Sequence, residues 1–484
     1  MRGNQRTSGE LSRKEGGKIF GSGSRTPISI TILVRKPNHA GSAAIHYEAV
    51  ADYLSREEKL ALVSERGSML SNKMSLSSIA PNQAGDWINQ RDGLFETFIP
   101  IGDKEEKSEK TFFVPFYSCG VKTQRDTWCY NFCKEVLASS MRRTIDFYND
   151  HIGKVPTYSS THINWTRATL NNLERGKKTA FSEQSICTAM YRPFCKQNLY
   201  FDRFWNEMVY QIPRLFPTPQ SKNLVICTAG VGSKTFSALI TDQIPDLHIL
   251  ESGTQCFPLY WYEKNERDTL SLFDNGNSDY SRRSGLTDFI IKRAREEYGP
   301  KTSAEDIFYY VYGLLHSTDY RKKFAADLTK DLPRIPLVGS PQDFKAFMKA
   351  GRKLADLHLN YETGPLCQQL IITGEKPGKL NVTKMRFPSK ENKGTILFND
   401  SVKIENIPMT AYDYVVNGKS AVEWIMERYA VTKNADSGIV NDPNLWSDNP
   451  RYILDLVSRV IQMSVETQKI VAGLPKVDFS SQKS

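Results

Sequence analysis

The sequence predicts a mixed α/β and α+β fold for this chain of 484 residues. Alternating and aliphatic residues over 26–34 are typical of a strand with one buried face. Apolar residues recur at helical spacing over 52–70, 125–149 and 306–316. The chain exceeds a single domain, since domains run to roughly 100–200 residues. We place a boundary at 154–157, which divides the chain into residues 1–150 and 151–484.

Composition places the chain among folded globular proteins with a positive net charge. It has 39% hydrophobic and 24% charged residues, and 64 Lys and Arg against 54 Asp and Glu leave a formal charge of +10. No apolar run approaches the roughly 18 residues of a membrane-spanning helix. No apolar segment follows the basic N-terminus as it does in a secretory signal. We therefore expect a cytoplasmic protein with no membrane partner.

The cysteines and histidines predict neither a disulfide framework nor a metal site. The eight cysteines are spread along the chain without any CxxC pair. Cys129 and Cys133 stand four apart, but zinc needs four converging ligands and the nearest histidine in sequence is His151. We expect no metal on this chain.

The first 150 residues begin with a strongly basic segment. Residues 1–36 hold eight basic and two acidic residues and lead through glycines into the run TPISITILV at 26–34. This run predicts a strand, and a single strand is unstable without a partner. A helix follows over 52–70, where Ser55 and Glu58 have the spacing of a capping box. Short strands and turns over 79–118 precede a helix over 125–149.

The region after residue 154 is predicted to consist of short elements bounded by prolines and aromatic residues. Two helices stand out. The first runs from Asp306 to His316 with one apolar face. The second begins after Ser340, with this serine as N-cap and Pro341 at the first helical position.

No catalytic motif is complete. Gly418-Lys419-Ser420 matches the end of a phosphate-binding P-loop, but Asp413 stands where the pattern requires glycine. The stretch GVGSKT at 230–235 fails because its lysine does not follow the glycine directly. The chain also lacks GxGxxG after a strand and the GxSxG nucleophile elbow. We predict no ATP site and no catalytic residue, and we interpret Glu57-Glu58-Lys59, a fragment of metal-nuclease motifs, as solvated charges.

A second basic segment spans 321–353, with nine basic residues against three acidic ones. On the helix after Ser340 the cations share one face, so this face can follow phosphates. Lys384 and Arg386 flank Met385 as on a strand with both cations on one face, from which they could reach base edges. For any single cation, an ordinary solvent-facing charge is the alternative. The predicted DNA-binding residues are Lys322, Lys323, Arg334, Lys345, Lys349, Arg352, Lys353, Lys384 and Arg386.

Four segments resemble the C-terminal specificity region of Type ISP restriction-modification enzymes. They are DIFYYVYGLLH at 306–316, DLPRIPL at 331–337, VNGKSAVEW at 416–424 and SGIVNDPN at 437–444, in the family's order. Upstream, FGSGSRTPI at 20–28 and the residues through Lys36 resemble the closing strands of the family's adenine-N6 methyltransferase domain. The resemblance implies that residues 1–150 are the C-terminal, incomplete part of a methyltransferase-like domain. It implies that residues 151–484 are the target-recognition domain.

The same resemblance indicates what this chain lacks. In this family one polypeptide carries a nuclease, an ATP-dependent motor, a coupler, the methyltransferase and the target-recognition domain. The catalytic Asn-Pro-Pro-aromatic motif of the methyltransferase does not occur here. S-adenosylmethionine, ATP and Mg²⁺ are therefore expected only for the complete system. Phe20 is similar in place to the aromatic residue that stacks on the flipped target base, and a core aromatic at a strand end is the alternative.

These observations predict a DNA target-recognition protein that contributes specificity to methylation and cleavage and is not catalytic alone. Its expected partners are double-stranded DNA and a companion polypeptide with the methyltransferase, motor and nuclease domains. Two alternatives remain open: a diverged methyltransferase or nuclease that is active by itself, and a non-functional gene fragment. Binding of S-adenosylmethionine separates the first alternative from the specificity role, because the glycine loop for this cofactor is missing.

Overall fold

The computed structural model describes residues 3–5, 9–20, 23–69, 71–105, 108–158, 161–265 and 279–479. The chain divides into two compact units. The first comprises Met1–Phe95 and Asn417–Lys419, and the second comprises Glu96–Val416 and Ser420–Ser484. The boundary predicted near residue 154 falls inside the second unit, between α4 (Lys134–Asp150) and α5 (Arg167–Glu174). The assignment of residues 1–150 and 151–484 to functional domains stays a prediction.

The described part of the first unit contains two helices and a two-stranded sheet. These are α1 (Gly9–Glu15), α2 (Arg56–Arg66), β1 (Ile45–Tyr47) and antiparallel β2 (Ser77–Ile79). The predicted capping box of α2 is confirmed, because the Ser55 hydroxyl accepts from the Glu58 N–H and the Glu58 carboxylate accepts from the Ser55 N–H. The prediction of a solvated Lys59 is wrong. Its buried ammonium donates to the carbonyls of Glu15 and Gly17.

The strand predicted over 26–34 is not present. Residues 23–36 have no regular secondary structure, and Ile30, Ile32, Leu33 and Val34 are 71%, 60%, 86% and 81% exposed. An alternating segment becomes a strand only when a neighbour takes its hydrogen bonds and a core covers its apolar side chains. No strand of the described residues pairs with this segment. The strand predicted from the sequence therefore does not form, because no other strand of the described residues pairs with this segment.

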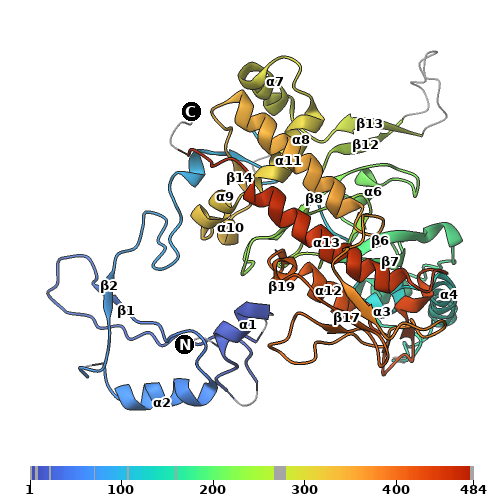
Figure 1. Cartoon of the computed structure of the whole chain (residues 1–484), viewed down its shortest axis with the longest axis horizontal. Coiled ribbons are helices and arrows are strands. Elements are labelled where there is room, and N and C mark those ends of the chain that lie inside the picture. The colour runs from blue at the N-terminus through green and yellow to red at the C-terminus, as the bar shows by residue number, and fades with distance from the viewer. Residues whose placement is uncertain are drawn as a thin grey trace. The chain divides into compact units, whose positions relative to one another are not determined.

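The second unit contains two four-stranded sheets, which appear beside its helices in Figure 1. One has the order β10-β6-β7-β5, in which only the β10-β6 pair is parallel. The other is antiparallel with the order β4-β11-β8-β9. These strands are β4 (Ser118–Cys119), β5 (Tyr130–Asn131), β6 (Ile186–Arg192), β7 (Cys195–Tyr200), β8 (Val225–Thr228), β9 (Ala238–Thr241), β10 (Ile244–Pro245) and β11 (Gln255–Pro258).

Shorter strand pairs and helices complete the described part of this unit. The shorter strands are β3 (Ile99–Pro100), β12 (Tyr260–Lys264), β13 (Tyr280–Ser284), β14 (Arg334–Ile335), β15 (Ile371–Thr373), β16 (Ile396–Leu397), β17 (Lys403–Glu405), β18 (Val415–Val416), β20 (Thr432–Lys433) and β21 (Val440–Asn441). Strand β19 (Lys419–Ser420) contributes one residue to each unit. The other helices are α3 (Asp126–Cys129), α6 (Ile212–Leu215), α7 (Asp288–Tyr298), α8 (Ala304–Leu314), α9 (Thr318–Lys323), α10 (Asp327–Lys330), α11 (Pro341–Leu359), α12 (Ala421–Arg428) and α13 (Tyr452–Ala472). Among the described residues, no helix is long and apolar enough to cross a membrane.

The predicted helices are confirmed, one of them with an interruption. The helix expected over 125–149 is broken where β5 pairs with β7, so that α3 ends at Cys129 and α4 begins at Lys134. The helix expected at 306–316 is α8. The helix expected after Ser340 is α11, and the Ser340 hydroxyl accepts from the Asp343 N–H with Pro341 at the start. The mixed α/β and α+β class is likewise confirmed.

Helices α8 and α11 cross at one glycine from each helix. A Cβ atom on Gly313 would lie 2.2 Å from the Phe347 carbonyl oxygen, and one on Gly351 would lie 1.9 Å from the Tyr309 carbonyl oxygen. Both distances are well inside the van der Waals separation of about 3.5 Å for non-bonded heavy atoms. The two helix backbones therefore touch directly, and any side chain at either glycine would separate them.

A buried polar chain connects α8, α11 and α13. Tyr312 Oη lies 2.6 Å from His358 Nδ1, and His358 Nε2 lies 3.0 Å from Thr467 Oγ1. Burial lowers the pKa of His358 to about 3, and the positive charge of Arg321 acts in the same direction. Burial also lowers the pKa of His316, whose ring lies 5.6 Å from that of His358. Both imidazoles are therefore neutral in the folded protein at neutral pH.

Gly351→Ala should destabilise the second unit by about 1–3 kcal/mol, because the added methyl must push two packed backbones apart. Urea unfolding followed by tryptophan fluorescence measures the change. Gly394→Ala is the matched control, since a Cβ there would meet only the Asn392 side chain, at 3.7 Å. Equal stability of Gly351→Ala and the wild type would contradict the close approach of the helices.

His358→Gln should reduce the loss of stability on acidification. Folding lowers the pKa of His358 from 6.5 to about 3. Between these two pH values, the imidazole is protonated in the unfolded state and neutral in the folded state. Its contribution is therefore present above pH 6.5 and is lost as the pH falls toward 3. Acidification from pH 7 to pH 5 should therefore lower the free energy of unfolding of the wild type by about 2 kcal/mol through this group.

Urea unfolding midpoints at pH 7 and pH 5 measure this effect as the difference between the variant and the wild type. His39→Gln, at an exposed histidine of the first unit, is the control. Parallel pH profiles for His358→Gln and the wild type would disprove the role of His358.

Candidate nucleic-acid interface

The outer face of α11 carries the cations predicted for it. The inner face packs toward α8 and α13, with Phe347 and Leu354 fully buried. The outer face exposes four cations: Lys345, Lys349, Arg352 and Lys353. Among the described residues, the three lysines make no hydrogen bond or ion pair. This face can therefore attract a polyanion.

Two predicted arginines are engaged within the protein. Arg352 pairs with Asp306 at 3.4 Å, and its guanidinium lies 4.3 Å from the centroid of the Tyr309 ring. It remains 48% exposed, so it keeps donors that face solvent. Arg334 on β14 is half-buried and donates to the carbonyls of Glu96 at 3.3 Å and Phe98 at 3.4 Å. Arg334 therefore joins two backbone segments that are far apart in sequence.

Lys322 and Lys323 lie at the end of α9 and are both exposed. The Lys323 ammonium lies 5.8 Å and 5.5 Å from the ring centroids of Phe324 and Phe479. The preceding Arg321 turns inward, where its Nε donates to the Leu315 carbonyl. Of the three consecutive cations, Lys322 and Lys323 are thus the ones presented to solvent.

Lys384 and Arg386 share one face of an extended segment, as predicted. Both are exposed, whereas Met385 between them is 3% exposed. Arg386 pairs with Leu397 of β16 through two backbone hydrogen bonds of 3.1 Å and 2.8 Å. This segment therefore extends the three-stranded sheet of order β15-β17-β16.

Sequence reasoning missed one cation of this sheet. Lys403 on β17 is exposed and lies directly opposite Leu397, which in turn lies opposite Arg386. Residues opposite one another in an antiparallel sheet point to the same face. The only sequence signal was the alternation of Lys403, Ile404 and Glu405, which does not reveal the partner strand.

The predicted cations do not form one continuous surface. Figure 1 shows α11 on one side of α13 and β17 on the other. Helix α13 packs against α11 and lies between α11 and β17 in this view. Two distinct cationic surfaces of the second unit are therefore available: the α11 face and the sheet face.

Phe20 lies in the first unit and is 55% exposed. Its neighbour Ile19 is 4% exposed and occupies the buried position instead. The Phe20 ring is therefore exposed in this structure, and both interpretations of it, base stacking and a core aromatic at a strand end, stay predictions. Gly21 and Ser22, part of the resemblance to the methyltransferase domain, lie outside the described residues.

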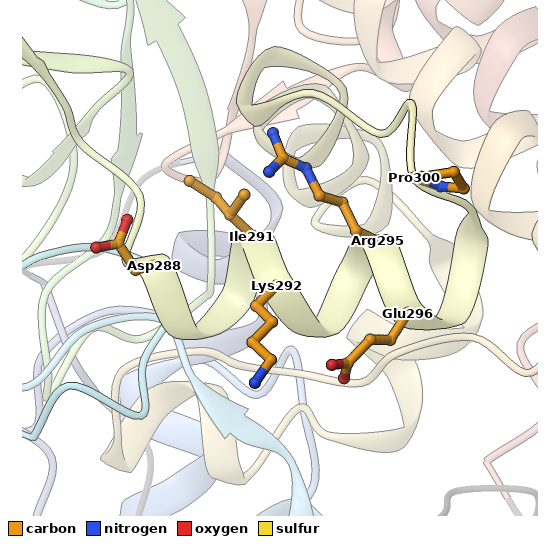
Figure 2. Close-up of a pocket in the computed structure, with 6 residues that line it drawn as sticks. All are labelled: Asp288, Ile291, Lys292, Arg295, Glu296 and Pro300. Atoms are coloured by element: carbon orange, nitrogen blue, oxygen red, sulfur yellow. The ribbon is translucent and has the colours of Figure 1, made fainter.

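An open pocket of about 520 Å³ lies beside α7 (Figure 2). Figure 2 shows Ile291 and Arg295 on one side of the helix and Lys292 and Glu296 on the other. Asp288 and Pro300 complete the lining. The pocket combines both signs of charge on a single helix, so it has no preference for a polyanion and we assign it no function.

The most strongly perturbed carboxyl group lies in a buried charge network. Asp246 is 1% exposed, and burial raises its pKa to about 7 although the Arg192 guanidinium opposes this shift. Arg192 pairs with Asp246 at 2.7 Å and with Asp126 at 3.1 Å, and the Tyr130 hydroxyl donates to Asp246 at 3.0 Å. The carboxylate is fully engaged by protein groups. This network therefore holds β5, β6 and the start of α3 together.

The amino-acid sequence of the second unit matches a known protein family. The sequence profile of the Type ISP C-terminal specificity domain matches residues 112–456. No curated protein matches the chain.

Three solved structures are similar to 99% of the chain. The first is a nuclease-deletion mutant of the Type ISP restriction-modification enzyme LlaGI in complex with a DNA substrate mimic, at 38% identity and a TM-score of 0.85 over 43% of that protein. The second is the ATP-dependent Type ISP restriction-modification enzyme LlaBIII bound to DNA, at 36% identity and a TM-score of 0.87 over 30% of that protein. The third is a DrdV–DNA complex, at 30% identity and a TM-score of 0.82 over 47% of that protein. The chain thus spans less than half the length of each of these proteins.

Proposed function

The chain belongs to the family of Type ISP restriction-modification enzymes, and from this membership we propose that it recognises a specific sequence in double-stranded DNA. The observation that carries the proposal is that three similar proteins were solved in complex with DNA or a DNA mimic. The match extends over both units of the chain. In this role the chain contributes specificity to methylation and cleavage by a restriction-modification system and works in the cytoplasm.

The exposed cations supply the electrostatic part of this function. Lysines with no partner inside the protein can neutralise phosphates, which gives affinity and register but no sequence information. Among the residues that the structure describes, Lys349 on α11 and Lys384 beside the sheet fit this description. Arg352 and Arg334 contribute less directly, because each is already held by protein groups. Base edges must then be read by other polar side chains in the grooves.

Phe20 is proposed to stack on the flipped target base. Its exposed ring supports this role, because a base can reach it without displacing the core. A companion polypeptide is proposed to carry the methyltransferase, motor and nuclease domains. Its sheet would also offer a strand with which the apolar segment at 28–34 can pair.

The residues of this chain do not fit the cofactors of the complete system. The glycine loops for S-adenosylmethionine and ATP are missing from the sequence. The described residues contain no cluster of three or more His, Cys, Asp or Glu side chains that could hold a metal ion. We therefore assign no reaction step to them here and propose that the companion polypeptide binds S-adenosylmethionine, ATP and Mg²⁺.

Selection of bound duplexes from a random-sequence pool tests the proposed function. The purified chain should enrich one short asymmetric site, and its affinity should fall steeply as salt rises. Binding without any enriched sequence, even after the upstream polypeptide of the same system is added, would overturn the proposal.

Lys349→Ala should weaken DNA binding equally for all sequences. Log affinity falls linearly as log salt rises, and loss of one phosphate contact makes this line less steep by about 0.9. Fluorescence anisotropy of a labelled duplex over a salt series measures this slope. Lys292→Ala, at an exposed helical lysine of α7, is the control and should leave the slope unchanged. An unchanged slope in Lys349→Ala would remove α11 from the interface.

A further inference from the structure

The exposed face of the β15-β17-β16 sheet carries a row of residues that runs across the strands. Thr373 lies opposite Lys403, Lys403 opposite Leu397, and Leu397 opposite Arg386. Four backbone segments thus contribute one residue each to the same row. Lys384, two residues from Arg386, stands on the same face.

The opposite face of this sheet fixes the row in place. Ile396 and Ile404 are fully buried and directly opposite each other in the ladder. The Asn399 side-chain amide donates to the carbonyls of Lys379 and Asn381 at 3.0 Å each, which holds the chain that leads to Lys384. The cations therefore project from a backbone that is anchored by both packing and hydrogen bonds.

The cations of the row have no partner among the described residues. Lys384, Arg386 and Lys403 are exposed, and their side chains make no hydrogen bond or ion pair there. An anion can therefore bind them without breaking an internal contact. Neighbouring strands lie about 4.8 Å apart, so Arg386 and Lys403, two strands apart, are separated by roughly 10 Å. Both cations can therefore contact nearby phosphates of the same DNA strand.

The charges on the exposed face of the sheet favour a DNA backbone that crosses the strands over one that runs along β17. Along β17, the residue that follows Lys403 on the same face is Glu405, whose carboxylate accepts from the Thr373 hydroxyl at 3.2 Å. A phosphate backbone that followed β17 would meet this negative charge. A backbone that crosses from Lys403 over Leu397 to Arg386 meets only cations and one aliphatic side chain.

We propose that this row is a phosphate-binding track on which one strand of the duplex crosses the sheet, with Lys403 as a DNA-contacting residue. The proposal rests on the proposed function of DNA recognition and adds to it a surface separate from α11. Because the row binds backbone phosphates, it positions the duplex and does not read its sequence.

Binding of the full chain to a labelled random-sequence duplex over a salt series tests the track. Lys403→Ala and Arg386→Ala should each make the fall of log affinity with log salt less steep by about 0.9. The double variant should make it less steep by about 1.8. Between 50 and 200 mM salt, each single variant should then lose about 3.5-fold less affinity than the wild type. Lys433→Ala, at an exposed strand lysine outside this sheet, is the matched control.

Glu405→Gln tests the direction of the track. It removes the negative charge beside Lys403 and should raise affinity severalfold, whereas Glu297→Gln at an exposed acid of α7 should not. Thermal melting of every variant should match the wild type, because all these side chains are at least partly exposed. Unchanged salt slopes in Lys403→Ala and Arg386→Ala, with the wild type still bound to DNA, would overturn the track alone. A wild type that binds no duplex would instead overturn the proposed function.

Discussion

The direct backbone contact between α8 and α11 at Gly313 and Gly351 is the constraint on which the second unit depends. It brings two helices closer than any side chain would allow, and it orients the inner face of α11. The buried link from Tyr312 through His358 to Thr467 then attaches α13 to the same pair. The inner face of α11 packs against α8 and α13, so the lysines on its outer face project into solvent.

Two groups of charged residues in this unit have different roles. Asp246 is buried and pairs with Arg192, and the half-buried Asp126 also pairs with Arg192, so these residues join strands and helices within the protein. The lysines of α11 and of the sheet face are exposed and make no hydrogen bond or ion pair within the described part of the chain. Only the second group is available to a polyanion without the cost of breaking a buried pair. This separation supports a scaffold that stays rigid while its surface exchanges counterions for phosphates.

The first unit depends on a different constraint. Its segment at 28–34 has the alternation of a strand, but no strand of the described residues pairs with it. Strand formation is a property of a pair, in contrast to helix formation, where hydrogen bonds close within the segment.

The sequence alone predicted four of the helices, the caps of two of them and the family. Ser55 and Ser340 act through residues three positions away, and such local signals survive in the linear order. The long motifs likewise identified the Type ISP specificity region without any coordinates. The amphipathic pattern of α11 also predicted correctly which of its faces would be exposed.

Tertiary structure alone decided what depends on pairing between distant segments. It placed Lys403 and Arg386 in one row on either side of Leu397, buried Lys59 against carbonyls at the end of α1 and just after it, and separated the α11 face from the sheet face. Among the described residues, it pairs no strand with the segment at 28–34. Strand register and desolvation are set by residues far away in the chain, so the local pattern of amino acids does not contain them.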